Sequence, residues 1–152
     1  MYSDSDIKII KGDDHILNHQ GNYFGSKKAN PEAICSGIAQ AAMLLGCVDV
    51  AVQKFDNWWL VSGEVDWLKQ PNQIQITDTE VFTSLRAFPE AGDNWFRSEY
   101  LAVVFSSALV TFDGNSSKVI KGNKSNLMQF NKLTSELESK KRIIGFIFEK
   151  SI

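Results

Sequence analysis

The chain has 152 residues, of which 43% are hydrophobic and 11% aromatic, which is enough to bury the core of one domain. We therefore expect a single domain over residues 1–152. The formal net charge is −2, which provides no general attraction for nucleic acid or for acidic membranes, and we exclude both as expected partners. No stretch has the pattern of a secretory signal or a membrane span, so we expect a cytoplasmic protein.

The clearest predicted helix lies between Asn30 and Gly46. Asn30 suits the N-cap, Pro31 suits the first turn and Gly46 suits the end. Apolar residues recur on one stripe of this helix, which we expect to lie on a sheet; they are Ile34, Ile38, Ala41 and Leu45. A hairpin is predicted next, with Val48, Val50 and Val52 alternating along its first strand, a turn at residues 55–57 and a return through residues 58–65.

The second half of the chain predicts further helices and another hairpin. After an extended segment at residues 74–76, Thr77 and Glu80 form a capping-box pattern, and the helix that follows would bury Val81, Leu85 and Phe88. A third helix is predicted from Ser98, with Leu101, Val104, Phe105 and Ala108 inward. Residues 109–122 predict a hairpin, residues 126–141 an amphipathic helix and residues 143–150 a strand. This order predicts an α+β two-layer sandwich with a mixed, mainly antiparallel sheet and helices on one face.

Part of this pattern resembles a known family. The segment Gly21–Gly25 (GNYFG), the helix ending at Gly46, the hairpin CVDVAVQKFDNWWLVSGEVDWL and the segment EVFTSLRAFPEAGDNWF follow one another over roughly residues 21–112. In this order they resemble the ATPase domain of DNA gyrase and its relatives, the GHKL superfamily of ATPases. The resemblance implies a GHKL-like fold.

The sequence departs from the family at each nucleotide-binding element. The resemblance places the family's catalytic Glu at Ile34 and its Mg²⁺-binding Asn at Ile38, and neither isoleucine has an oxygen ligand for a cation. Ser62 or Gly63 stands near the adenine-binding Asp, and Trp67 stands where a glycine is required. The lid region, residues 93–104, has no glycine. We therefore expect a scaffold without ATPase chemistry, with no cofactor and no catalytic residue.

Other candidate sites are weaker than their structural alternatives. His15 and His19 have the i, i+4 spacing of zinc ligands, but the adjacent glutamate and a third ligand are missing, so we expect a surface pair and no metal. Cys35 and Cys47 lie among apolar residues and predict free core thiols. Glu64 and Asp66 have the spacing of an acid/base pair on one strand face, although solvated surface carboxylates are the more common arrangement.

Charge is divided unevenly along the chain. Between Glu64 and Glu99, seven acids stand against three bases, and between Lys121 and Lys150, seven bases stand against three acids. The acidic segment also carries aromatic residues, a combination suited to a basic protein surface. Its predicted partner-binding residues are Glu64, Asp66, Trp67, Glu90, Asp93 and Trp95.

The leading hypothesis from the sequence is a non-enzymatic immunity protein that neutralises a cognate bacterial toxin. The chain resembles the immunity proteins of contact-dependent growth inhibition and related polymorphic toxin systems, which implies that it would cover the active site of a basic toxin domain such as an RNase. Two alternatives remain open: a divergent GHKL-type nucleotide-binding protein, and a regulator that mimics gyrase.

Overall fold

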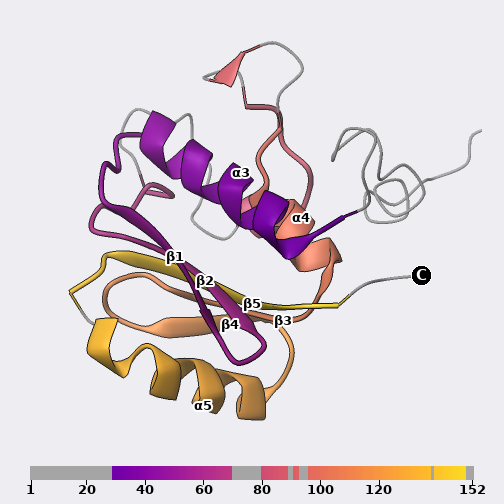
Figure 1. The fold of residues 1–152 in the computed structure, drawn as a ribbon, viewed down its shortest axis with the longest axis vertical. Helices are drawn as coiled ribbons and strands as arrows, with labels where there is room; N and C mark the ends of the chain where they lie inside the picture. The colour runs from indigo at the N-terminus through magenta and orange to yellow at the C-terminus, as the bar shows by residue number, and fades with distance from the viewer. Residues whose placement is uncertain (1–28, 70–79, 89–90, 93–95, 138, 150–152) are drawn as a thin grey trace, which may run out of the picture.

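The computed structural model describes residues 29–69, 80–88, 91–92, 96–137 and 139–149 (Figure 1). These residues form a five-stranded antiparallel sheet in the order β1-β2-β5-β3-β4. Its strands are β1 (Val50–Phe55), β2 (Trp58–Gly63), β3 (Ser106–Phe112), β4 (Ser117–Lys121) and β5 (Arg142–Phe148). The α-helices are α3 (Pro31–Leu44), α4 (Glu99–Val104) and α5 (Lys124–Leu133), and two 3₁₀ turns are η2 (Glu80–Phe82) and η4 (Ser135–Leu137). The predicted α+β sandwich with a mainly antiparallel sheet is confirmed.

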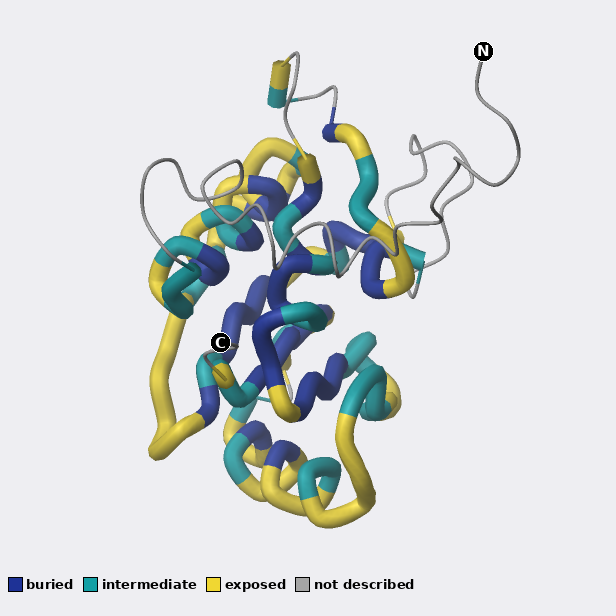
Figure 2. The backbone as a smooth tube through the Cα atoms, turned by 90° about the vertical axis from the view of Figure 1, so that its right-hand side faces the viewer, coloured by how far each residue is buried: buried dark blue, intermediate teal, exposed yellow. Residues whose placement is uncertain are grey.

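Helices pack on both faces of the sheet. The face covered by α3 and α4 receives Val61 from β2 and Ile144 from β5, whereas the face covered by α5 receives Leu60 and Ile143 from the same two strands (Figure 1). This alternation buries the central strands on both sides, while the outer side of α5 stays exposed (Figure 2). The helix layer expected on one face is present, and α5 adds cover to the opposite face because Phe130 enters that second core.

The helix predicted after Asn30 is confirmed in its start and its buried face. The Asn30 side chain accepts a hydrogen bond of 2.7 Å from the Ala33 amide, and Pro31 occupies the first turn. Gly46 follows the helix with a φ of +104°, a conformation that favours glycine. Ile34 and Ile38 are fully buried, so the predicted stripe does face the sheet.

Two predicted helices are shorter in the structure. The helix expected from Thr77 lies partly outside the described residues, and its described part is the single turn η2, in which consecutive residues Val81 and Phe82 are both buried. The helix predicted from Ser98 ends at Val104, because the chain then pairs with β5 as strand β3, which includes Ala108. Tertiary pairing thus overrides the helical spacing.

The C-terminal elements follow the prediction with shifted bounds. Helix α5 starts at Lys124, two residues before the predicted start, because Asn123 and Asn126 form a capping box with bonds of 2.9 and 3.1 Å. The helix ends at Leu133, and η4 follows. The predicted hairpin and the last strand are present as β3, β4 and β5.

Candidate partner-binding surface

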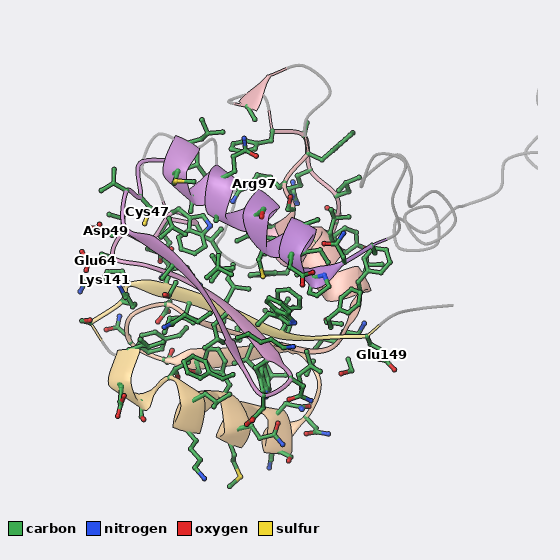
Figure 3. All side chains as sticks on the ribbon, viewed as in Figure 1. Cys47, Asp49, Glu64, Arg97, Lys141 and Glu149 are labelled. Atoms are coloured by element: carbon green, nitrogen blue, oxygen red, sulfur yellow. The ribbon has the colours of Figure 1, made fainter. Side chains whose placement is uncertain are left out.

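Glu64 and Asp66 lie where β2 ends and β5 begins, opposite residues of the basic C-terminal segment. Figure 3 shows Asp49, Glu64 and Lys141 together at this end of the sheet, with Glu149 at the other end. Lys140 Nζ lies 3.8 Å from Glu64 Oε1, and the Glu64 side chain is 55% exposed. Glu64 therefore remains accessible to a partner.

Asp66 belongs to a buried network around Arg142. Arg142 is fully buried, and its Nε and Nη2 atoms donate to the two Asp66 carboxylate oxygens at 2.8 Å each. Arg142 Nη1 donates to Thr111 Oγ1 at 3.0 Å, and the Leu68 amide donates to Asp66 Oδ1 at 3.1 Å. Asp66 thus neutralises a buried cation and fixes the loop after β2, and this structural role replaces the predicted contact with a partner.

Trp67 is fully buried in the core beneath α3 and offers no surface to a partner. A Cβ atom at Gly63 would lie 2.5 Å from Cys47 Sγ and 3.1 Å from Trp67 Cζ3, so a larger residue there would displace the Cys47 thiol and crowd the indole. The indole N–H has no hydrogen-bond partner among the described residues. The prediction of Trp67 as a contact is corrected, because its area is buried inside the domain. Glu90, Asp93 and Trp95 lie outside the described residues.

The acidic segment is neutralised by the chain's own bases wherever the structure describes it. The pairs are Glu64 with Lys140, Asp66 with Arg142, Glu80 with Arg86, and Glu99 with Arg97. The last pair is buried, with the Arg97 guanidinium 5.1 Å from the Phe88 ring centre. The other acids of this segment, Asp78, Glu90 and Asp93, lie outside the described residues. A count of charges over one segment of the sequence does not reveal these ion pairs, because two of them join residues 76 positions apart.

The positions that the gyrase-like resemblance assigns to nucleotide binding hold core residues. Ile34, Ile38 and Trp67 belong to one apolar cluster and are fully buried in it. Ser62 is also buried, and its hydroxyl has no hydrogen-bond partner among the described residues. These four side chains are therefore not accessible to a nucleotide.

Two cavities border α5. One of about 360 Å³ is lined by Asp56, Asn57, Trp58, Gln129, Lys132 and Leu133, and in it Trp58 Nε1 donates to Gln129 Oε1 at 3.2 Å. The second, of about 200 Å³, is lined by Phe112, Ser117, Asn131, Thr134 and Ser135. The first lining holds one carboxylate and one amine, from Asp56 and Lys132, and the second holds the hydroxyls of Ser117, Thr134 and Ser135.

Metal-ligating side chains do not gather in the described part of the chain, where no group of three or more His, Cys, Asp or Glu could hold an ion. His15 and His19 lie outside it. No helix among the described residues has both the length and the apolar character needed to cross a membrane.

The buried thiol of Cys35 gives a pH-dependent prediction. Burial, and secondarily the charge of Glu32, raise the pKa of Cys35 from 9.0 to about 12. A raised folded-state pKa means that this contribution to stability is complete below pH 9.0 and is lost as the pH rises toward 12. We expect iodoacetamide at about pH 8, below the ordinary thiol pKa, to leave Cys35 unmodified in the folded chain and to modify it in urea, as measured by mass spectrometry. Rapid modification of the folded chain would contradict this burial.

Exposed large hydrophobic side chains concentrate on one stretch of the chain. Of the eight among the described residues, five lie between residues 43 and 55, and we call them the apolar strip: Met43 (53% exposed), Leu44 (49%), Val48 (83%), Val52 (45%) and Phe55 (36%). The strip runs from the end of α3 through the following loop and along β1. The strand predicted from the alternation of Val48, Val50 and Val52 is present as the edge strand β1, and of these three valines Val50 packs against the core.

Comparisons with protein-family models, with curated proteins and with solved structures give no significant match for this chain.

Proposed function

We propose that this chain is a non-enzymatic binding protein that neutralises a cognate toxin domain, as immunity proteins of contact-dependent growth inhibition do. The observation that carries the proposal is the apolar strip. All five of its large apolar side chains are exposed to solvent, and Val48 is 83% exposed. Concentrated exposed apolar side chains are a feature of protein-binding surfaces. The proposal places binding on this strip and on Glu64, in place of the acidic aromatic segment.

Charge near the strip favours a basic partner. Asp49 precedes β1, Asp56 follows it, and both are exposed. Glu64 is exposed at the same end of the sheet as Asp49, with Lys140 Nζ 3.8 Å from its carboxylate and Lys141 at the same end (Figure 3). Lys54, the one base within β1, is also exposed and lies 5.1 Å from the Trp59 ring centre. Carboxylates around an apolar centre steer a basic surface toward it and pair with its cations at the rim.

The proposed mechanism is occlusion. An interface of standard size removes roughly 800 Å² of surface from each partner, and a domain of this size can supply that area. By covering the substrate cleft of a basic toxin in the cytoplasm, the chain would keep the toxin from its substrate without performing any chemistry.

Recovery of the partner tests this function. The tagged chain would be purified from its native host, and bound proteins would be identified by mass spectrometry. We expect one stoichiometric basic protein that arrests growth when expressed alone, with growth restored when this chain is expressed with it.

Two results would contradict the proposal. One is a recovered partner whose activity is unchanged by the chain. The other is the absence of a stoichiometric partner together with a stabilising thermal shift on addition of Mg-ATP, which would favour the nucleotide-binding alternative.

A further inference from the structure

The outer edge of β1 pairs with no strand in the described part of the chain. Among the described residues β1 pairs with β2 and with no other strand, and the ladder is regular over all six of its residues. In an antiparallel pair, every second residue directs its N–H and C=O groups away from the neighbouring strand. The outer side of β1 therefore carries a row of backbone groups that can accept a further strand.

Both faces of β1 carry exposed apolar side chains beside this row. Val52 pairs with Val61 and shares the α3 face, whereas Phe55 pairs with Trp58 and shares the α5 face. An incoming strand places its own side chains alternately on the two faces, so it would meet Val52 on one side and Phe55 on the other.

The opposite edge of the sheet differs from β1. Strand β4 carries Lys118 and Lys121, and Lys121 Nζ donates to the Val103 carbonyl at 2.9 Å. The ladder between β3 and β4 has an irregularity at Leu109 and Val110, and α5 packs against β4. Lysines, irregular register and a covering helix all hinder strand addition. Strand β1 also carries one lysine, Lys54, and contacts α3, so the two edges differ in the irregular register and the second lysine of β4. Strand addition is therefore expected at β1.

Charge indicates which kind of strand would pair with β1. Asp49 precedes it and Asp56 begins the turn after it with a φ of +54°, and both are exposed. A partner strand with Lys or Arg near each end would meet both carboxylates, with the exposed Lys54 between them.

We infer that β1 binds an extended segment of a partner protein by strand addition, and that this segment alternates apolar residues between flanking cations. The inference rests on the proposed function, for which it supplies the recognition mode. Recognition would combine backbone hydrogen bonds along β1, apolar contacts with the strip, and ion pairs at Asp49 and Asp56.

A displayed library of random twelve-residue peptides tests this inference with a defined probe. We expect enriched peptides to alternate apolar residues between two cations, and to slow amide exchange at alternate residues of β1 when observed by NMR. Val52→Lys should weaken their binding about tenfold or more by placing a cation in the strip. Asp49→Asn combined with Asp56→Asn should weaken binding and reduce its dependence on salt.

Matched controls come from α5 and η4. Met128, 73% exposed on α5, becomes Met128→Lys, and the exposed Glu136 of η4 becomes Glu136→Gln; both should bind the peptides as the native chain does. The inference is overturned if no peptide is enriched, if Val52→Lys binds normally, or if the free chain sediments as a stable dimer that Val52→Lys dissociates.

The growth assay separates this inference from the proposed function. If the chain restores growth and Val52→Lys restores it equally well, strand addition is wrong while the function stands. If peptides bind β1 but the chain suppresses no partner's activity, the function is wrong while the edge strand remains a binding site.

Discussion

Replacing Asp66 by alanine is expected to lower the free energy of unfolding by about 3–5 kcal/mol. The substitution removes the carboxylate that pairs with the fully buried guanidinium of Arg142. It also removes the acceptor for the Leu68 amide, so the loop after β2 loses an anchor. Urea unfolding monitored by circular dichroism measures the change.

The control is the neighbouring carboxylate. Glu64→Gln removes an exposed ion pair with a long separation and should change stability by no more than about 0.5 kcal/mol. Removing both buried partners, in Asp66→Ala with Arg142→Met, should be less destabilising than Asp66→Ala alone, because no unpaired charge stays in the core. Equal stability of the native chain and Asp66→Ala would show that the network is not formed in solution.

Replacing Trp67 by alanine is expected to destabilise the chain by about 3–5 kcal/mol. The indole fills the core between the end of β2 and α3, and the nearby Gly63 and Cys47 leave little room for collapse. Thermal unfolding measures the effect. Its size would identify Trp67 as a core residue, whereas a partner contact would leave the stability of the free chain unchanged.

Trp67→Phe separates packing from polarity. Phenylalanine retains most of the apolar contact and removes an indole N–H that has no partner among the described residues, so the change should stay below about 1.5 kcal/mol. A loss as large as that of Trp67→Ala would contradict this environment and indicate that the N–H is hydrogen-bonded.

Local patterns in the sequence predicted much of the fold. The capping Asn30, the apolar stripe of α3 and the apolar run of β5 each depend on neighbours within a few residues, and the structure has all three elements. The helix expected to run past Val104 ends there, because the chain continues as β3 and pairs with β5. Strand β5 lies more than thirty positions away, so no local pattern predicts this pairing. The face covered by α5 depends on the same long-range order.

The candidate surface was harder to predict than the fold. Asp66 and Trp67 have the residue types of a binding site. In the structure Asp66 pairs with the buried Arg142, and Trp67 packs beside Gly63 in the core. Val48 and Val52 have the residue type of a core. Both are exposed, because Val48 lies just before the edge strand β1 and Val52 lies in it. Residue type indicates what a side chain can do, and strand order decides whether it faces solvent.

The most direct test of binding through the apolar strip is the affinity of the partner recovered with the native chain. Titration calorimetry would compare the native chain with Val48→Lys and with Met128→Lys, two lysine substitutions at highly exposed apolar positions on different sides of the domain. We predict that Val48→Lys weakens binding about tenfold or more and that Met128→Lys leaves it unchanged. Unchanged affinity for Val48→Lys, or a loss confined to Met128→Lys, would contradict binding through the strip.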